Sequence, residues 1–319
     1  MNILVTGCAG FIGFHLCNVL LKKRKIKIFG VDNINSYYSA SLKKYRLSLL
    51  RKKKNFIFSK IDISNFKNLE KLFKKQKIDM VINFAAQAGV RYSLVNPIEY
   101  IQTNILGFFN ILELSKIYRV KNIFYASSSS VYGDHKKFPL SENVTLVPKN
   151  IYSFSKKNNE DIAKIYKETY GINSVGLRFF TVYGEWGRPD MLMMKYMIAK
   201  KKNRPFVLNN KGNHYRDFTY IDDAINLLVK LLFSKKKKKE IYNICSNKPI
   251  SVKKILIILN KLYGKPKIIN EKRLTIEVLR THGSNKAIKN ITKFYKFTDI
   301  YVGTKNLVLW AKKYLDKIN

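Results

Sequence analysis

The sequence predicts an α/β protein with a doubly wound parallel sheet and a smaller, interleaved C-terminal domain. Short apolar runs alternate with helical stretches through the first half of the chain, which is the pattern of a parallel sheet with helices on both faces. A loop containing Gly7, Gly10 and Gly13 follows the first apolar run and opens the first helical stretch. Beyond residue 178 the alternation loosens, so the sequence favours a second domain there.

Six short apolar runs are predicted to be strands of this sheet, because each is separated from the next by a helical or polar stretch. They cover residues 2–6, 27–31, 56–61, 80–84, 122–126 and 174–177. Between them, helices are predicted over residues 14–23, 69–75 and 103–118. The last of these carries apolar residues at helical spacing, such as Ile105, Phe108 and Leu112.

The second half of the chain is predicted to be less regular. Residues 184–190 and 206–215 are expected to be irregular, whereas 218–232 and 241–245 are expected to return to the sheet. We therefore predict a larger domain over residues 1–178 with returns at about 216–245. A smaller domain is predicted over residues 179–215 and 246–319.

The charge balance is typical of a protein that binds nucleic acid or an anionic membrane, because the chain has 61 Lys and Arg but 21 Asp and Glu, which gives a formal net charge of +40. However, 11 of the 61 are Arg, the residue that recognition sites favour for its forked guanidinium. The lysines are spread along the chain in short runs, so we expect a compositional bias and no nucleic-acid partner. The chain has no run of about 18 apolar residues, so we expect no membrane partner.

The cysteines and histidines indicate whether the chain forms disulfides or binds a metal. The chain has three cysteines, Cys8, Cys17 and Cys245, and no two of them form a C-x-x-C motif. Because their number is odd and this motif is missing, neither a disulfide framework nor a zinc knuckle is expected. The four histidines show no ligand spacing, and we predict no metal. The first strand begins near the N-terminus and leaves no room for a secretory signal, so a cytoplasmic location is expected.

The glycine loop and an acidic residue together predict a dinucleotide site. Glycines at this turn let the backbone approach a pyrophosphate, whose charge the N-terminus of the next helix attracts. Asp32 lies 19 residues after Gly13 and closes the second strand. A carboxylate there accepts hydrogen bonds from a ribose and repels a 2′-phosphate, so NAD is expected rather than NADP.

Tyr152 and Lys156 form a Y-x-x-x-K pair. Residues four apart share one face of a helix, so an ammonium can lie beside a phenol and favour its ionised form. A solvated pair on an amphipathic helix would explain the pentapeptide taken alone. Its combination with a dinucleotide loop favours a catalytic base.

These motifs resemble those of the extended short-chain dehydrogenase/reductase family, and within it the nucleotide-sugar epimerases, from residue 1 to about residue 225. The resemblance rests on the glycine loop, Asp62-Ile63, segments 84–91 and 127–133, Tyr152 with Lys156, and blocks 178–184, 186–191 and 216–223. It implies that the larger domain is a Rossmann-type NAD-binding domain and the smaller one a substrate-binding domain. It also implies a homodimer formed through the helices near 103–118 and 152–170.

The resemblance implies roles for individual residues as well. Ser128, Tyr152 and Lys156 are the implied catalytic residues. Contacts with NAD are implied for Gly7, Gly10, Phe11, Ile12, Gly13, Asp32, Asn33, Asn35, Asp62, Ile63, Phe84, Ala85, Ala86, Gln87, Asn104, Tyr152, Lys156 and Phe179. Contacts with a UDP-sugar are implied for Arg91, Ser127, Ser128, Ser129, Tyr152, Thr181, Arg188, Val207, Asn209 and Arg216, and a structural role is an equal alternative for Arg91.

The residues after Ser128 separate the reactions that such enzymes catalyse. Related dehydratases and decarboxylases carry carboxylates there, whereas this chain has Ser129 and Ser130, and hydroxyls of ordinary pKa cannot replace a carboxylate acid or base. Epimerisation at C4 of UDP-glucuronate to UDP-galacturonate, through a 4-keto sugar, needs none. Two alternatives stay open: a 4-epimerase of neutral UDP-hexoses, such as UDP-glucose or UDP-N-acetylglucosamine, and a non-catalytic dinucleotide-binding regulator or RNA-binding relative.

Overall fold

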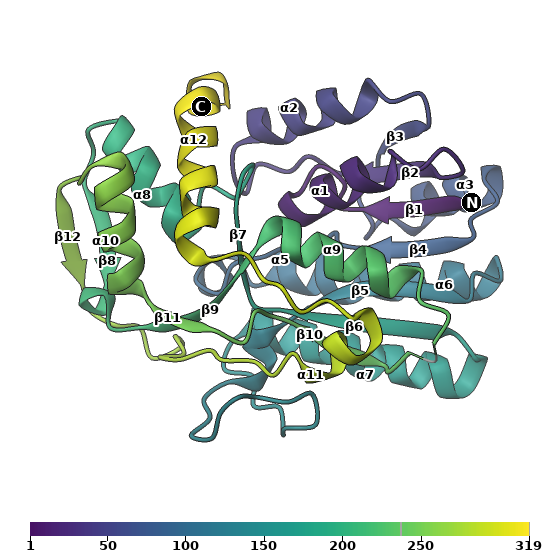
Figure 1. The fold of residues 1–319 in the computed structure, drawn as a ribbon. Helices are drawn as coiled ribbons and strands as arrows, with labels where there is room; N and C mark the ends of the chain where they lie inside the picture. The colour runs from purple at the N-terminus through teal and green to yellow at the C-terminus, as the bar shows by residue number, and fades with distance from the viewer. Residues whose placement is uncertain (237, 319) are drawn as a thin grey trace.

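A seven-stranded parallel sheet runs through the centre of the molecule, as the computed structural model describes it for residues 1–236 and 238–318 (Figure 1). Its strand order is β10-β6-β5-β4-β1-β2-β3. The strands are β1 (Asn2–Thr6), β2 (Lys27–Asp32), β3 (Phe56–Lys60), β4 (Met80–Asn83), β5 (Asn122–Ser128), β6 (Asn173–Phe179) and β10 (Ile241–Ile244). The order reverses between β1 and β4, so the doubly wound class predicted from the sequence is confirmed.

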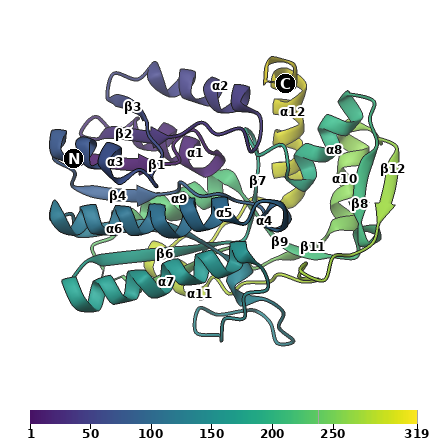
Figure 2. The ribbon, with the colours of Figure 1, turned by 180° about the vertical axis from the view of Figure 1, so that it is seen from behind.

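Helices cover both faces of this sheet, and each face has its own apolar core. One face carries α1 (Phe11–Leu20), α2 (Ala40–Arg51) and α9 (Ile221–Leu232), and Figure 1 shows these helices in front of the sheet. The opposite face carries α3 (Phe66–Lys75), α6 (Gly107–Ile117) and α7 (Ile151–Tyr170), which come forward in Figure 2. Because both faces are covered, β1, β4 and β6 are almost fully buried, and β1 and β4 consist mainly of apolar residues.

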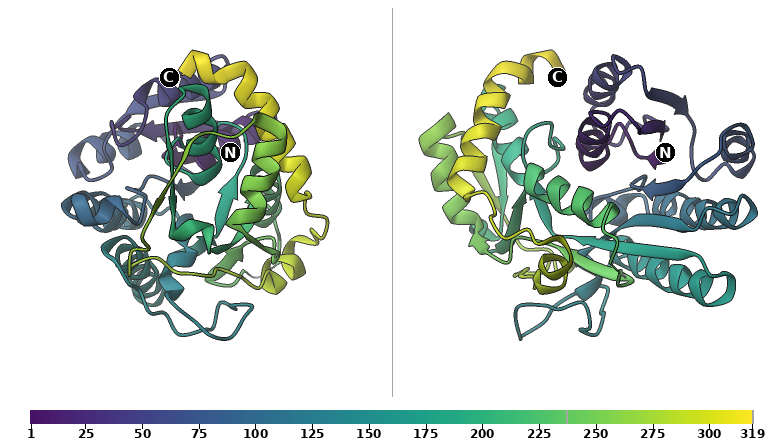
Figure 3. Two further views of the ribbon diagram at one scale, coloured as in Figure 1. Left: turned by 90° about the vertical axis from the view of Figure 1, so that its left-hand side faces the viewer. Right: turned by 45° about the vertical axis from the view of Figure 1, so that its right-hand side comes forward.

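A smaller body packs beside the carboxyl ends of the strands (Figure 3). It contains a three-stranded sheet in the order β11-β9-β7 and a two-stranded sheet of β12 and β8. These strands are β7 (Thr181–Tyr183), β8 (Phe206–Asn209), β9 (Tyr215–Tyr220), β11 (Pro249–Ser251) and β12 (Ile268–Glu271). The helices of this body are α8 (Leu192–Lys201), α10 (Val252–Tyr263) and α12 (Ile300–Ile318), and their buried residues continue the core of α1 and α9.

Short helical segments complete the chain. Segments α4 (Tyr92–Val95) and α5 (Ile98–Tyr100) lead into a π-helical turn, η1 (Ile101–Leu106), which continues directly as α6. The remaining segments are the 3₁₀ turns η2 (Ser129–Tyr132) and η3 (Asn210–Gly212) and helix α11 (Lys286–Thr292). The π turn replaces the regular helix predicted to begin at residue 103.

Several sequence-based expectations need correction. The first helix begins at Phe11 rather than at residue 14, because the glycine loop leads straight into it. Residues 206–215 are not wholly irregular, since they contain β8. Within residues 218–232, β9 does not join the central sheet, because it pairs with β7 and β11, whereas α9 packs beside α1 on one face of that sheet. The predicted return at 241–245 is correct, because β10 pairs with β6.

Candidate active site

The main pocket of the molecule lies at the carboxyl ends of the central strands, which is where parallel sheets of this class bind ligands. Its walls come from the loops after β1, β2, β4 and β5, from the start of α7, and from the segment after β6. The sequence-predicted residues that line it are Gly7, Gly10, Phe11, Ile12, Gly13, Asp32, Asn33, Asn35, Asp62, Ile63, Phe84, Ala85, Ala86, Gln87, Ser127, Ser128, Tyr152, Lys156, Phe179 and Arg188. Most of the predicted site is thus brought together in one cavity.

Two glycines of the first loop cannot carry a side chain. Gly7 has φ +68°, and a Cβ there would lie 2.6 Å from the backbone nitrogen of Ala85. A Cβ on Gly13 would lie 2.2 Å from the carbonyl oxygen of Gly7. The Gly10 N–H donates to that same carbonyl at 2.9 Å. The turn is therefore tight enough to point the N-terminus of α1 into the pocket, as an anionic pyrophosphate requires.

Asp32 ends β2 and its carboxylate is held by two backbone donors. Ala9 N–H donates to Oδ2 at 3.1 Å and Ile34 N–H to Oδ1 at 2.8 Å. Burial raises the pKa of Asp32 above its ordinary value, against these hydrogen bonds and the charge of Lys43. Neighbouring Asn33 donates to Asp62 Oδ2 at 2.8 Å. These oxygens fix an acceptor-rich edge of the pocket that suits ribose hydroxyls.

Ser128 and Tyr152 lie on the same wall of the pocket, and the Ser128 hydroxyl acts on the Tyr152 phenol. Ser130 Oγ lies 2.9 Å from Ser128 Oγ, and Ser130 N–H also donates to that oxygen at 3.2 Å. Burial raises the pKa of the Tyr152 phenol, while the hydrogen bond to Ser128 and the charge of Arg188 oppose the rise. The phenol of the protein alone is therefore neutral at pH 7.

Lys156 lies one helical turn after Tyr152, and its ammonium donates to the carbonyl oxygen of Ala126 at 2.9 Å. Burial lowers the pKa of Lys156 to about 8, against the charge of Glu160. The sequence predicts an ammonium that favours the ionised phenol. In this structure the ammonium is anchored on the strand backbone instead, and Arg188 is the cation that lowers the phenol pKa.

Arg188 enters the pocket already paired. Its Nε donates to Asp190 Oδ1 at 3.0 Å, and its Nη2 contacts Asp190 Oδ2. The guanidinium also lies over the ring of Tyr37, 5.7 Å from the ring centre. Tyr37 donates to Asp190 Oδ2 at 3.1 Å. The predicted substrate arginine is thus held rigidly at the pocket wall by its own counter-ion.

The other predicted residues do not line the main pocket. Asn104 lies in η1, and its side chain accepts from the Gln87 N–H at 2.8 Å and donates to the Gln87 carbonyl oxygen at 3.0 Å. Asn104 therefore supports the segment beneath the pocket. Ser129 begins η2, and Thr181 lines a smaller cavity below the main one. Val207 and Asn209 lie in β8. Their predicted contacts with ligands stay predictions.

A second polar cluster surrounds Glu277. Arg91 donates to Glu277 Oε1 from Nε at 2.8 Å and from Nη2 at 2.6 Å. Arg216 donates to the carbonyl oxygens of Tyr215 and Leu279 at 2.9 and 3.2 Å, and burial lowers its pKa to about 10. Within the described residues, His214 Nε2 and Glu277 Oε2 are buried without a hydrogen-bond partner and lie 3.9 Å apart. Unsatisfied buried groups of this kind point to a polar ligand.

Sequence reasoning missed four residues of this region. Tyr37, Tyr38 and Lys43 line the pocket, and Lys43 donates to Asn35 O at 2.9 Å. Arg46 is fully buried beneath the glycine loop. Its Nη1 donates to Ala9 O at 2.9 Å, and its Nη2 donates to the carbonyl oxygens of Trp186 and Gly187. Residues 37–46 show no motif of their own, and helix α2 that carries two of them was itself not predicted.

Fold and site together define a Rossmann-type enzyme with a Tyr and Lys pair at the dinucleotide pocket. The chain belongs to the NAD dependent epimerase/dehydratase family, whose model matches residues 3–245. It is 40% identical to Protein CapI of Staphylococcus aureus, over 99% of this chain and 100% of that protein. It is 38% identical to a UDP-glucuronate 4-epimerase of Thermodesulfobacterium geofontis, over 99% of this chain and 97% of that protein.

Solved structures agree with this assignment. The chain superimposes on a UDP-glucuronic acid 4-epimerase from Bacillus cereus, crystallised with UDP-glucuronic acid and NAD, with a TM-score of 0.92. Sequence identity is 32%, and the match covers 98% of this chain and 99% of that one. No helix among the described residues is long and apolar enough to span a membrane.

Proposed function

We propose that this protein is an NAD-dependent UDP-glucuronate 4-epimerase that forms UDP-galacturonate through a 4-keto sugar. The observation that carries the proposal is the placement of Ser128, Tyr152 and Lys156 on one wall of the dinucleotide pocket. Relatives that cover nearly the whole chain bear that name, which supports the choice of substrate. NAD fits the pocket, because the tight glycine turn and the carboxylate of Asp32 provide the two features that its pyrophosphate and ribose need.

The chain supplies the acid–base part of this reaction. When bound, NAD supplies hydride acceptance and return at C4 of the sugar. Tyr152 takes the proton of the 4-hydroxyl and later returns it, and Ser128, on the same pocket wall, binds the same sugar oxygen. Lys156 provides a fixed positive charge one turn away. Because the proton and hydride are both returned, no external reductant is consumed.

The strand end lacks the groups that other reactions of the family need. Ser130 bonds Ser128 rather than presenting a carboxylate, and Ser127 Oγ donates to Glu160 at 2.5 Å. Elimination across C5 and C6, or decarboxylation, requires a carboxyl acid or base beside the sugar. Oxidation and re-reduction at one carbon is what this wall supports.

The cluster around Glu277 is proposed to hold the UDP moiety. Arg91 and Arg216 supply positive charge for the diphosphate, because guanidinium forks suit phosphate oxygens. The unpartnered His214 Nε2 and Glu277 Oε2 offer a donor and an acceptor to the nucleoside. Asn209 Oδ1, which is also buried without a partner among the described residues, offers a further acceptor.

One observation favours the neutral-sugar alternative. Arg188, proposed to meet the sugar carboxylate, is already paired with Asp190 through its Nε and Nη2 donors. A uronate carboxylate would have to share this guanidinium, whereas a neutral hexose would leave the ion pair intact. The substrate choice therefore depends on the charge of this pocket wall, which a direct comparison of substrates can measure.

The test is a comparison of kcat/KM for UDP-glucuronate, UDP-glucose and UDP-N-acetylglucosamine, with separation of the products. We expect UDP-glucuronate to be preferred, with UDP-galacturonate formed and neither carbon dioxide nor a pentose released. Arg188→Ala should reduce kcat/KM for the uronate selectively, by about 1 to 3 kcal/mol of transition-state stabilisation. Equal turnover of a neutral sugar, or an equal effect of Arg188→Ala on both, would favour the neutral-sugar epimerase.

We also propose that the protein is a homodimer that acts in a reducing cytoplasm. Helices α6 and α7 lie side by side on one face of the sheet and carry exposed apolar residues, among them Phe109 at 41% and Phe154 at 47% exposure. Such a patch is typical of an interface between subunits. The three cysteines are free and buried, which fits a reducing compartment.

A further inference from the structure

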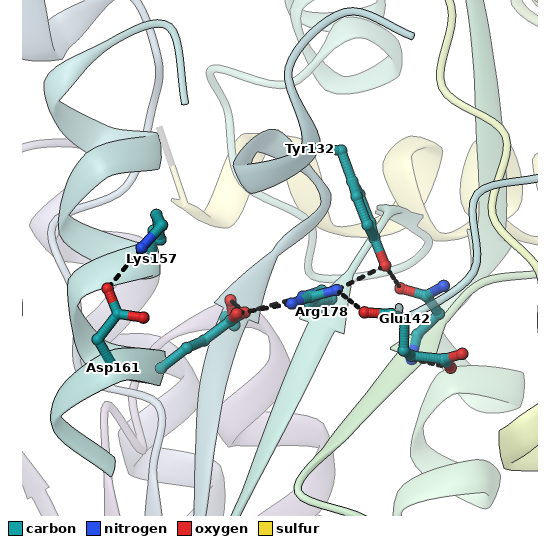
Figure 4. Close-up of polar contacts among 8 residues, drawn as sticks. Tyr132, Glu142, Lys157, Asp161 and Arg178 are labelled. Carbon is teal, nitrogen blue, oxygen red and sulfur yellow. Dashed lines mark hydrogen bonds and ion pairs between the residues drawn. The ribbon is translucent and has the colours of Figure 1, made fainter. Parts of the chain in front are cut away.

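A buried charge network lies directly behind the strand end that carries Ser128 (Figure 4). Glu160 Oε1 accepts hydrogen bonds from Ser127 Oγ at 2.5 Å and from Arg178 Nε at 2.9 Å, and its Oε2 accepts one from Arg178 Nη2 at 2.7 Å. The side chains of Arg178 and Glu160 are 4% and 7% exposed. Both are thus withdrawn from water, and each satisfies the other.

The far side of Arg178 is also fully engaged. Its Nη1 donates to Tyr132 Oη at 2.9 Å and to the carbonyl oxygen of Glu142 at 3.0 Å. Tyr132 in turn donates to Asn243 Oδ1 at 2.7 Å. Figure 4 shows Arg178 extended between α7 and Tyr132, with the surface pair Lys157–Asp161 further along the same helix. The network therefore joins α7, β5, β6, η2 and β10, and Ser127 is its member that also lines the main pocket.

Glu160 extends the spacing of the catalytic residues on α7. Tyr152, Lys156 and Glu160 are four residues apart and share one helical face. Two of them bond the end of β5, because Lys156 donates to the carbonyl of Ala126 and Glu160 accepts from Ser127, while Tyr152 lines the same pocket wall as Ser128. Two consecutive residues of the strand are thus fixed by two successive turns of the helix.

We infer that Glu160 is a positioning residue of the epimerase, which keeps the Lys156 ammonium charged inside the buried wall and fixes the strand end that carries Ser128. This inference rests on the proposed function. A lysine buried without an anion loses its proton readily. Glu160 is the carboxylate one turn away, and its charge acts on the ammonium of Lys156.

The groups around Lys156 determine in which direction its pKa should change when the Glu160 charge is removed. Burial lowers the pKa of Lys156 to about 8, and the charge of Glu160 raises it. The titratable or charged groups on the elements packed around this point are Tyr152 on α7, Tyr125 on β5, Arg178 on β6, Tyr132 on η2, and Arg188 in the segment after β7. Removing the Glu160 charge should therefore lower the pKa of Lys156 further, so that the ammonium is lost at lower pH.

The variant Glu160→Gln tests the inference, because it keeps the shape and removes the charge. The direct measurement is the pH dependence of acetylation at Lys156 by trace acetic anhydride, read peptide by peptide by mass spectrometry. The second measurement is the pH profile of kcat. We expect the Lys156 titration and the alkaline limb of kcat to move to lower pH together, by about 0.5 to 1 pH unit, and kcat at pH 8 to fall about two- to fivefold with KM changed less than about twofold.

Two further variants separate this role from a purely structural one. Glu160→Gln combined with Arg178→Gln removes both buried charges, so it relieves the uncompensated arginine of the single variant. If Glu160 acts on Lys156, the double variant still shows a titration displaced to lower pH, by less than in Glu160→Gln because the loss of the Arg178 charge raises the pKa of Lys156. Glu240→Gln is the matched control. Glu240 forms an ion pair at 2.6 Å with Lys167, which lies on α7 like Glu160, but the side chains of Lys167 and Glu240 are 39% and 48% exposed. This variant should leave both profiles unchanged.

The outcomes are distinct. A Lys156 titration that does not move in Glu160→Gln, or that returns to the wild-type position in the double variant, overturns the inference. If Glu160→Gln does not fold, the double variant decides by the same titration. Failure of the wild-type protein to turn over any UDP-sugar overturns the proposed function instead, while the acetylation curve still reports whether Glu160 holds the charge of Lys156.

Discussion

Tyr152 shows how much of the proposed chemistry depends on one oxygen. Its phenol shares the pocket wall with Ser128, and burial there raises its pKa, so the proton acceptor is not ionised by the protein alone. Tyr152→Phe keeps the ring, which packs against Tyr100 with ring centres 6.1 Å apart. We expect kcat to fall by a factor of about 100 or more, as for loss of a positioned general base.

The check on Tyr152→Phe is a measurement of turnover beside the NAD content of the denatured protein. Cofactor content should equal that of the wild type, because the glycine loop and Asp32 are untouched. Turnover at the wild-type rate would contradict the acid–base role of Tyr152.

Asp32 carries a second prediction at the residue scale. Its two oxygens are held toward the pocket by Ala9 and Ile34, and they are expected to accept the ribose hydroxyls of NAD. Asp32→Ala should lower NAD occupancy of the purified protein by about tenfold, equivalent to about 1.4 kcal/mol. Assay of the supernatant after denaturation measures it, and near-stoichiometric NADP in the wild type would contradict the preference for NAD.

Single residues differ in how far the sequence alone could place them. Gly7, Gly13 and Asp32 were predictable, because a tight turn and a strand-end acid occur at fixed spacing after the first strand. Arg46 was not, because its partners are backbone oxygens far away in the chain. Lys43 was not, because it and its partner Asn35 belong to no recognisable motif. Glu160 follows Lys156 at helical spacing, yet only the position of Arg178 on β6 identifies its partner.

At the scale of elements, strands were predicted better than the connections between them. The central strands are continuous apolar runs because both faces are buried, so their composition alone marks them. Helix α2 was missed because its sequence is polar overall, and two of its five buried side chains are the charged Lys43 and Arg46. Strand β9 was placed in the wrong sheet, since its pairing with β7 and β11 depends on tertiary contacts that no local pattern encodes.

Helix α1 carries a prediction about acid stability. His15 lies against the rings of Phe11 and Phe14 and contacts the carbonyl of Glu185 at 2.9 Å. Burial lowers its pKa to about 4, whereas an unfolded histidine has a pKa of about 6.5. As pH falls from 6.5 to 4, His15 becomes protonated in the unfolded chain but stays neutral in the folded protein. This contribution to stability is therefore complete above pH 6.5 and is lost as pH falls.

Urea unfolding at pH 7.0 and pH 5.0 measures this contribution. His15→Gln retains a polar amide without a titration, so it should reduce the loss of unfolding free energy between these pH values by about 2 kcal/mol relative to the wild type. The comparison of the two proteins removes the contribution of other titrating groups. Identical losses in both would show that His15 is protonated in the folded state.

The molecule as a whole carries a prediction about assembly. If α6 and α7 form the interface between subunits, light scattering at micromolar concentration should give about twice the chain mass of 37.3 kDa. Phe109→Glu places a charge in the apolar patch and should produce monomers. Leu309→Glu is the control, because Leu309 is 56% exposed on α12 and should leave the dimer intact. A wild type that is monomeric would contradict the interface.

Arg46 has a consequence for how the two ligands affect each other. It holds the carbonyls of Ala9 in the cofactor loop and of Trp186 and Gly187, directly before Arg188. A ligand that fixes the conformation of one of these loops therefore also favours one position of the other loop. By thermodynamic reciprocity, the factor by which NAD tightens UDP-sugar binding must equal the factor by which the UDP-sugar tightens NAD. The cofactor should accordingly be held most firmly in the middle of the reaction, when both loops are engaged.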